Sequence, residues 1–521
     1  MPEPIDRPLP APLAPTRRAV LGGLGGLAGA LAGCTAPPLA GAPVAAAADM
    51  VTPPPPAPRE WRAAWVASVA NIDWPRRPGP SAIKLREEVD AILDRSVWLG
   101  LNAIVLQVRP ACDAMYASPF EPWSEYLSGR QGQAPAGDWD PLEYWVDEAH
   151  RRGLELHAWF NPYRARHPSA RSPLVAGHIA RRRPELVRSY GDLRWLDPGE
   201  PAAATHTLTV IEDVVRRYDI DGVHIDDYFY PYPVTGPDGR DRPFPDEPSW
   251  QRYRRLGGLL ARDDWRRSNV DRLVEAIYHT VHQVKPWLRM GISPFGIGKP
   301  ALRPPGIEGF SQYDRLFADV ERWCEEGWLD YLAPQLYWRI DRPAQAFGPL
   351  LAYWQGRVGA GRHVWPGLFT DSVGRERNPW PADEVLAQVA LLRGQPPAGG
   401  HTHFSMTVLM QDRDAVARRL RDEAYATPAL IPAMPWLDAS VPPAPVLQAE
   451  DGGWRIAPGV GKPVTRWAVW RRLDGAWRFE TRLASETRLE GSADVVVSAV
   501  DRVGNESART AAPPITPSGS R

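Results

Sequence analysis

Eight short apolar runs, each followed by a longer amphipathic stretch, are the feature of this 521-residue chain that most restricts its fold. The runs have the length and composition of strands, and the stretches have the periodicity of helices. Parallel strands need crossover connections, and helices must cover the sheet, so eight such units predict an α/β fold, a (β/α)8 TIM barrel. The predicted strands are residues 62–69, 103–108, 154–160, 222–225, 289–293, 331–336, 363–368 and 401–405, and the predicted helices are 85–99, 141–152, 203–218, 266–284, 311–326, 344–354, 382–392 and 413–424.

The connections that follow the predicted strands are longer than those that precede them, notably at 110–140, 161–205 and 228–264. Long loops gathered on one face of a barrel build a cleft. Gly100 and Gly153 stand just before the second and third predicted strands, where a glycine suits a left-handed helix cap.

The fourth predicted strand runs directly into two adjacent carboxylates, Asp226 and Asp227. Residues 223–225 have strand propensity, while Pro231 and Pro233 prevent the strand from continuing. Both aspartates therefore stand at the C-terminal end of a barrel strand, where TIM-barrel enzymes carry their catalytic groups.

Polar and aromatic side chains also follow the other predicted strands. Amides, an arginine and aromatic rings next to carboxylates suit a neutral ligand rich in hydroxyl groups. Tyr230 is a further candidate for stacking on a sugar ring. The candidate substrate-binding residues are Asp73, Arg109, Trp159, Asn161, Tyr163, His224, Tyr228, Gln335, Tyr337 and Trp338.

The overall charge argues against a strongly charged partner. The chain has 61 lysines and arginines against 62 aspartates and glutamates, so no global field recruits nucleic acid. Its 23 tryptophans exceed what an ordinary composition supplies, and such a surplus is common where sugar rings stack on aromatic faces. The expected partner is therefore uncharged or weakly charged.

Residues 1–33 read as an export peptide. Arg17 and Arg18 form a twin-arginine pair before an apolar stretch at 19–32 that is too short and too rich in glycine to span a membrane. The tetrad at 31–34 resembles a bacterial lipobox, which implies lipidation of Cys34 and anchoring to a membrane that faces the periplasm or the cell exterior. Ordinary cleavage near the alanine run at 45–48 is the alternative. A tether rich in proline and alanine follows at 34–59.

No metal, cofactor or redox site is expected. Cys112 and Cys324 lack a CxxC neighbour, so they are either buried thiols or a disulfide. His157 and His224 have no third ligand at a suitable spacing and are expected to be interior histidines.

The barrel is expected to span residues 60–430, with a small all-β sandwich at 440–515. Short alternating runs at 465–471, 478–483 and 495–500 predict its strands. The closing segment at 499–507 resembles the last hairpin of a fibronectin type III module.

Five phrases of the barrel region closely resemble the bacterial family 10 glycosyl-hydrolase-like lipoproteins. The resemblance implies a barrel hydrolase of the cell envelope, and some members cut peptidoglycan glycan strands that lack stem peptides. It does not supply an assigned catalytic pair. The phrases are EWRAAWVASVANIDWP at 60–75, NAIVLQVRP at 102–110, HAWFNPYR at 157–164, DGVHIDDYFYP at 221–231 and PQLYW at 334–338.

Two catalytic schemes remain open. Most glycoside hydrolases flank the scissile bond with two carboxyl groups, so Asp226 requires a partner. Asp227 serves as that partner if the backbone turns at Asp226, as in the substrate-assisted hydrolases of N-acetyl sugars; on a continuous strand the two side chains point to opposite sides. No acidic residue ends the fifth or sixth predicted strand. The alternative partners therefore lie in loops: Asp73, Glu121, Glu125, Asp246 and Glu247.

We therefore expect a glycoside hydrolase that acts on cell-wall polysaccharide. The missing acid on strands five and six leaves a second hypothesis, a glycan-binding envelope lipoprotein without turnover.

Overall fold

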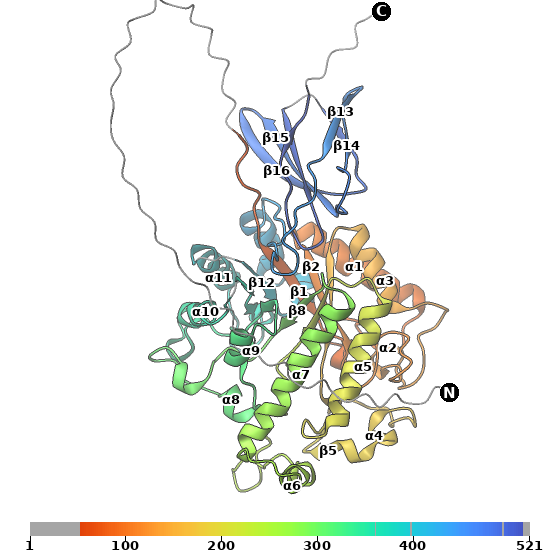
Figure 1. Ribbon diagram of the computed structural model, residues 1–521, viewed down its shortest axis with the longest axis vertical. Helices are drawn as coiled ribbons and strands as arrows, with labels where there is room; N and C mark the ends of the chain where they lie inside the picture. Colours follow the sequence, from red (N-terminus) through yellow and green to blue (C-terminus); the bar gives the residue numbers. More distant parts are fainter. Residues whose placement is uncertain (1–52, 360, 396–398, 492–493, 514–521) are drawn as a thin grey trace, which may run out of the picture. The chain divides into compact units, whose positions relative to one another are not determined.

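The computed structural model describes residues 53–359, 361–395, 399–491 and 494–513 (Figure 1). The predicted export peptide at 1–33, including Cys34 just after it, and most of the predicted tether at 34–59 lie outside the described residues.

A parallel sheet forms the centre of the barrel region, with the strand order β10-β9-β8-β7-β3-β2-β1-β12-β11. Each strand coincides with one of the predicted apolar runs. The strands are β1 Trp61–Val66, β2 Ala103–Arg109, β3 Glu155–Phe160, β7 Gly222–Ile225, β8 Arg289–Ile292, β9 Tyr331–Leu332, β10 His363–Val364, β11 Gly367–Leu368 and β12 Gly400–His403.

The strands β10 and β11 are two halves of the predicted strand at 363–368, and together they close the ring. β10 pairs with β9, whereas β11 pairs with β12. The Trp365 N–H donates to the Leu332 carbonyl on one side (2.8 Å), and the Thr402 N–H donates to the Pro366 carbonyl on the other (3.0 Å). The predicted TIM barrel is therefore confirmed.

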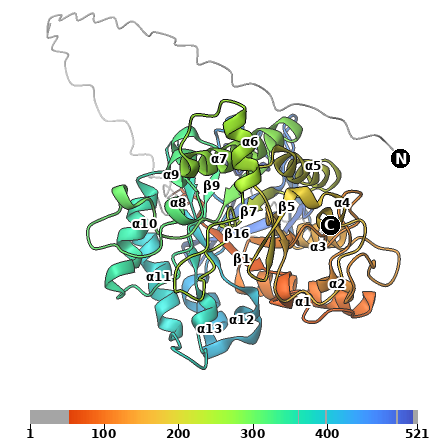
Figure 2. The same cartoon turned by 90° about the horizontal axis from the view of Figure 1, so that it is seen from below.

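Helices surround the strands (Figure 2). Six of the predicted helices form within a few residues of the expected bounds. The stretch at 311–326 instead divides into α8 and α9, and Phe317 between them has a positive φ of 53°. The stretch at 413–424 becomes α13 followed by a π-helical turn, Leu420–Ala424. The helices are α1 Ala82–Leu99, α3 Pro141–Arg151, α5 Pro201–Arg217, α7 Arg262–Val284, α8 Gln312–Arg315, α9 Val320–Glu326, α10 Phe347–Gln355, α11 Ala382–Gly394, α12 Met406–Gln411 and α13 Val416–Arg419.

Local sequence explains where the first helices begin and end. The Ser81 hydroxyl accepts a hydrogen bond from the Lys84 N–H at the start of α1, and Asp140 caps α3 in the same way. Gly100 and Gly153 follow these helices with φ of 85° and 74°, so both predicted left-handed positions are confirmed.

Aromatic rings fill the barrel interior. Trp61 stacks on Trp365 with centroids 4.4 Å apart. The Tyr331 hydroxyl shares hydrogen bonds with Nδ1 of His157 (2.8 Å) and Nδ1 of His224 (3.0 Å). The interior is thus a packed layer beneath the C-terminal rim.

The long loops carry short elements of their own. A three-stranded antiparallel sheet forms within the predicted loop at 161–205. These additional elements are α2 Glu125–Ser128, β4 Arg164–Arg166, α4 Ile179–Arg182, β5 Val187–Tyr190, β6 Leu193–Leu196 and α6 Glu247–Arg255.

The C-terminal region consists of antiparallel sheets of three and four strands, with the orders β13-β14-β17 and β16-β15-β18-β19. Inward-facing Trp454, Trp467 and Val497 belong to one buried apolar cluster between them. The strands are β13 Val446–Glu450, β14 Gly453–Ala457, β15 Arg466–Leu473, β16 Ala476–Leu483, β17 Arg488–Glu490, β18 Val495–Val500 and β19 Thr510–Ala511.

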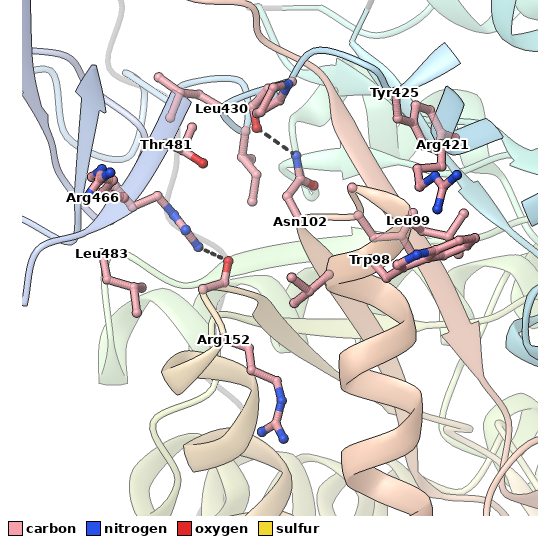
Figure 3. A pocket seen from close by; sticks show the side chains of 18 of the residues that line it. Trp98, Leu99, Asn102, Arg152, Arg421, Tyr425, Leu430, Arg466, Thr481 and Leu483 are labelled. Atoms are coloured by element: carbon pink, nitrogen blue, oxygen red, sulfur yellow. Dashed lines mark hydrogen bonds between the residues drawn. The ribbon is translucent and has the colours of Figure 1, made fainter. Parts of the chain in front are cut away.

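A pocket of about 520 Å³ lies where β16 faces the N-terminal ends of the barrel strands (Figure 3). The Arg466 guanidinium donates to the Gly153 carbonyl beside it, and the Arg421 guanidinium stacks on Trp98 at 4.2 Å. This pocket is on the face opposite the C-terminal strand ends, so it is separate from the predicted catalytic rim. Among the described helices, none combines the length and apolarity that crossing a bilayer requires.

Candidate active site

The strand β7 ends at Ile225, and both following carboxylates line one cleft. The Ser293 N–H still bonds the Ile225 carbonyl (2.9 Å), but the strand ends before Asp226. Because both side chains line the same cleft, the adjacent pair stays a candidate. The cleft has a volume of about 330 Å³ and is lined by Trp65, Ala67, Val69, Ala70, Ile72, Gln107, Trp159, Arg164, His167, Asp226, Asp227, Tyr228, Tyr232, Ser293, Gln335, Tyr337, Phe369 and Phe404.

Asp226 is a buried carboxyl that is 4% exposed. The Asn161 side-chain amide donates to both of its oxygens, at 3.3 and 3.2 Å. Burial raises the pKa of Asp226 to about 7, with the Arg164 guanidinium opposing this shift and the neighbouring Asp227 carboxylate adding to it. A carboxyl with such a pKa can both release and recover a proton at neutral pH.

Asp227 is equally buried, at 3% exposed, but has a different set of partners. The Tyr232 hydroxyl donates a hydrogen bond to its Oδ2. Burial raises the pKa of Asp227, while the hydrogen bonds from Tyr232 and Gln335 act to lower it. A donor directed at the carboxylate favours the ionised form, so Tyr232 stabilises Asp227 as an anion.

Aromatic rings form the walls of the cleft. Tyr337 stacks on Phe369 with centroids 4.8 Å apart and planes 14° apart, and Phe404 lies next to both rings. On the other wall the Arg164 guanidinium lies 4.8 Å above the Tyr228 ring. These flat surfaces suit the faces of sugar rings.

Two buried N–H donors at the cleft have no hydrogen-bond partner among the described residues. They are Nε2 of Gln107 and Nε1 of Trp159. The Trp159 indole also lies close enough to Asp226 to lower the pKa of that carboxyl. Buried donors are almost always paired in proteins, so these two indicate places where a ligand oxygen would bind.

The five loop acids that could have partnered Asp226 are all outside the cleft. Asp73 accepts hydrogen bonds from the Ala67 N–H, the Ser405 hydroxyl and the Thr407 N–H. Each of the other four is bound to arginines or backbone amides: Glu121 to Arg109, Glu125 to the N–H groups of Arg171 and Ser172, Asp246 to Arg262 and Arg266, and Glu247 to Arg262. Asp226 and Asp227 are the only carboxylates in the described cleft lining.

Sequence comparisons identify the family of the barrel region. A sequence model described as "Glycosyl hydrolase-like 10" matches residues 60–379. The chain belongs to the glycosyl hydrolase-like 10 family. It is 40% identical to "Glycosyl hydrolase YngK" of Bacillus subtilis (strain 168) over 397 residues, which cover 75% of this chain and 76% of that protein.

Other members and one solved structure are more distant. The chain is 34% identical to "Glycosyl hydrolase DigH" of Escherichia coli (strain K12) over 335 residues, covering 59% of this chain and 74% of that protein. The glycoside hydrolase domain of PgaB (BpsB) from Bordetella bronchiseptica matches with a TM-score of 0.47 and 15% identity, covering 70% of this chain and 98% of that domain.

Four of the predicted binding residues line the cleft of this glycosyl hydrolase-like 10 barrel: Trp159, Tyr228, Gln335 and Tyr337. Asn161 lies behind Asp226 and orients it, because its Oδ1 accepts from the Arg164 N–H (2.9 Å) while its Nδ2 donates to the carboxylate.

The structure places Arg109 away from the cleft, which corrects the prediction. All five of its N–H groups are used, because its guanidinium donates to Glu121 (2.6 and 2.8 Å), to the carbonyls of Asn161 and Pro162, and to the Cys112 sulfur. Arg109 does end β2, as its predicted place at a strand end requires, but a register shift between Gln107 and Arg109 interrupts the regular pairing there. Arg109 is therefore a structural arginine.

Four further predicted binding residues also lie outside the cleft lining. His224 lies one layer below, where its Nε2 accepts from Trp65 Nε1 (3.2 Å), and burial lowers its pKa well below the ordinary value. Tyr163 is fully buried in the main apolar core. Trp338 packs against Phe295 instead, and Asp73 connects the loops that follow β1 and β12.

The sequence predicts no metal site at the histidines and cysteines of the barrel, and the structure shows where these side chains lie. His157 and His224 are both bonded to Tyr331. Cys112 and Cys324 are buried free thiols. Within the described ranges, no group of three His, Cys, Asp or Glu side chains is arranged to hold a metal ion.

Sequence reasoning missed several cleft residues. Arg164 ends the phrase at 157–164, and Gln107 lies within the phrase at 102–110, so both belong to recognised motifs. Tyr232 stands between Pro231 and Pro233, for which the only predicted role is to end the strand. His167, Phe369 and Phe404 come from loops and carry no comparable signal.

Proposed function

We propose that this protein is a glycoside hydrolase of cell-wall polysaccharide, acting on the glycan strands of peptidoglycan. Membership of the glycosyl hydrolase-like 10 family supports a glycan-directed role. The observation that carries the proposal is the adjacent pair of buried carboxyls, Asp226 and Asp227, in a cleft with aromatic walls.

In this proposal Asp226 is the general acid. Its pKa of about 7 lets it hold a proton at neutral pH and donate that proton to the glycosidic oxygen as the bond to C1 breaks. Asp227, whose ionised form is favoured by the hydrogen bond from Tyr232, accepts the N–H of the substrate's acetamido group. The acetamido oxygen then attacks C1 and forms a cyclic intermediate, which water opens while Asp226 recovers its proton.

The position of the loop acids supports this scheme over a distant partner. A second acid that flanks the bond must reach the cleft, and the five candidates are held elsewhere by ion pairs and backbone bonds. Asp227 needs no movement, because it already lines the cleft. The unpaired donors of Gln107 and Trp159 would bind hydroxyl or carbonyl oxygens of the glycan.

The experiment compares wild type with Asp226→Asn on purified glycan strands, with and without stem peptides. Hydrolysis predicts new reducing ends with the wild type, and a loss of about 10³-fold or more in Asp226→Asn. Tight binding of the wild type without any product would reject hydrolysis in favour of a glycan-binding protein. The matched control is Asp241→Asn, which changes an aspartate on the same face outside the cleft.

We further propose that the protein is exported through its twin-arginine segment and anchored by lipid at Cys34, facing the periplasm or the cell exterior. Arg17, Arg18 and the lipobox-like residues 31–34 support this proposal. Metabolic labelling with a fatty acid analogue tests it, since Cys34→Ala should abolish labelling and release the protein from membranes.

The region at 440–515 is proposed to be a fibronectin type III-like module. Its three-stranded and four-stranded antiparallel sheets, packed face to face, support a sandwich of that class.

A further inference from the structure

A short loop after α6 exposes three leucines within five residues. Leu256, Leu259 and Leu260 are 82%, 90% and 43% exposed. Single exposed leucines are common, but three in one loop form an apolar surface that ordinarily has a partner. The loop belongs to the same β7-to-α7 connection that begins with Asp226, and it contributes nothing to the cleft lining.

The loop is held in this conformation by its own hydrogen bonds. The Leu260 N–H donates to the Tyr253 hydroxyl (3.0 Å), and Arg254 donates to the Gly258 carbonyl (2.7 Å). Trp250 and Tyr253 stack beneath it with centroids 5.6 Å apart, and Trp265 packs against both rings. These hydrogen bonds and ring contacts therefore hold the loop so that the three leucines face outward.

The charge around the leucines is positive. Two carboxylates from outside the loop region, Asp246 and Glu200, pair with Arg262, Arg266 and Arg252. Residues 247–267 themselves contain six arginines against three acidic residues. Each of those acids is paired with an arginine: Glu247 with Arg262, Asp263 with Arg266 and Asp264 with Arg267.

Arg254 and Arg255 adjoin Leu256 and form no ion pair with any described carboxylate. An apolar tip bordered by unpaired guanidinium groups and the half-buried rings of Trp250 and Tyr253 is complementary to the interface of an anionic membrane. Leucines enter the acyl boundary, aromatic rings lie at headgroup level and arginines bind phosphate groups.

We propose that the loop at 256–260 inserts into the interfacial layer of an anionic phospholipid membrane. This contact is distinct from the N-terminal anchor and does not depend on the hydrolytic activity. It would bring the C-terminal face of the barrel, and with it the cleft, close to the membrane surface.

Vesicle binding of the full chain tests the proposal, with Cys34→Ala in every sample so that no lipid is attached. The probes are vesicles of phosphatidylglycerol with phosphatidylcholine, and vesicles of phosphatidylcholine alone. We expect Leu256→Ser/Leu259→Ser to weaken binding to the anionic vesicles by about tenfold or more. The matched control Ile83→Ser removes an isoleucine that is 71% exposed on α1 and should bind as the unaltered chain does.

The N-terminal apolar segment is the same in all samples, so a second readout reports the loop itself. Leu259→Cys accepts an environment-sensitive dye, because Cys112 and Cys324 are buried. We expect a blue shift with anionic vesicles that neutral vesicles do not produce. Unchanged binding of the double variant, or dye emission that anionic vesicles leave unaltered, overturns the proposal. Glycan cleavage by the double variant should equal that of the unaltered chain, so failure of this proposal is distinct from failure of the hydrolase.

Discussion

The chemistry of the cleft depends on one carboxyl whose environment has changed its acidity. Asp226 loses solvent on burial, and the Arg164 charge, the Trp159 indole and the Asn161 amide offset only part of this loss. Its pKa of about 7 suits the proposed role of an acid, whereas burial raises the pKa of Asp227 and the phenol of Tyr232 opposes that rise.

The first prediction concerns the pH dependence of activity. Because Asp226 must be protonated to act as an acid, kcat/KM should fall about tenfold per pH unit above about pH 7. Initial rates on glycan strands across the pH range measure this. A rate that stays level to about pH 9 would contradict the assignment of Asp226 as the acid.

The same pKa shift predicts an effect on stability. The folded protein binds the Asp226 proton more tightly than the unfolded chain does, so the free energy of unfolding falls as pH rises from about 4 to about 7. Asp226→Asn removes this cost and should raise the free energy of unfolding by about 2–4 kcal/mol at about pH 8, with little change at about pH 4. Urea unfolding at the two pH values checks both outcomes.

Substitution of Arg109 should lower the free energy of unfolding, in contrast to substitution of Asp226. Arg109→Ala leaves Glu121 buried with a hydrogen bond to His206 but without its arginine, and should cost about 3–5 kcal/mol of unfolding free energy. The control is Arg216→Ala, which breaks an exposed pair with Glu212 and should cost less than about 1 kcal/mol. Equal effects of the two variants would show that the buried pair has no special role.

At the scale of elements, the eight strands and most helices could be predicted from hydrophobic periodicity alone, and so could the end of β7 before Asp226. The side chains that line the cleft could be predicted less completely than the strands and helices. Gln107 and Arg109 both stand near the end of the second predicted strand, but a register shift separates them and only Gln107 lines the cleft. Alternation assigns His224 to the inner face without saying that it lies one layer below Asp226.

Residues from distant loops were beyond sequence reasoning for a related reason. Phe369 and Phe404 meet Tyr337 only because the ring closes through β11 and β12. No local periodicity encodes a contact of that kind.

The packing of β8 against β9 provides the prediction at this scale. A Cβ atom on Gly291 would lie 1.9 Å from the ring of Tyr331, whose hydroxyl bonds His157 and His224. Gly291→Ala should therefore cost about 2–4 kcal/mol of unfolding free energy. Gly394→Ala, where nothing lies within 4 Å of the added atom, is the control and should be nearly neutral. Thermal unfolding of both variants distinguishes a clash with the Tyr331 ring from a general effect of replacing a glycine.

At the scale of the whole described chain, hydrogen bonds connect the C-terminal sheets to the barrel. Arg502 donates to Asp219 (2.6 Å) and Asp221 (3.1 Å) and to two backbone carbonyls. The Met434 N–H also donates to the Val503 carbonyl (2.9 Å). These bonds lie on the face opposite the cleft.

Arg502→Ala should therefore weaken the contact between the C-terminal sheets and the barrel without affecting catalysis. We expect a loss of about 1–3 kcal/mol in the free energy of unfolding and an unchanged kcat. Calorimetry should resolve separate transitions for the two regions in this variant. Arg488→Ala, an exposed arginine within the sandwich, is the control. A large fall in kcat for Arg502→Ala would contradict the conclusion that this contact is independent of the cleft.

The central claim is that adjacent carboxyls act together with the acetamido group of the substrate. The most direct test is kcat/KM of wild type and Asp227→Asn on glycan strands with and without N-acetyl groups, matched in length. Substrate assistance predicts that removing either the acetyl group or the Asp227 carboxylate costs about 10²-fold or more, and that removing both costs little beyond the larger single loss. Full activity of Asp227→Asn on N-acetylated strands would contradict the account.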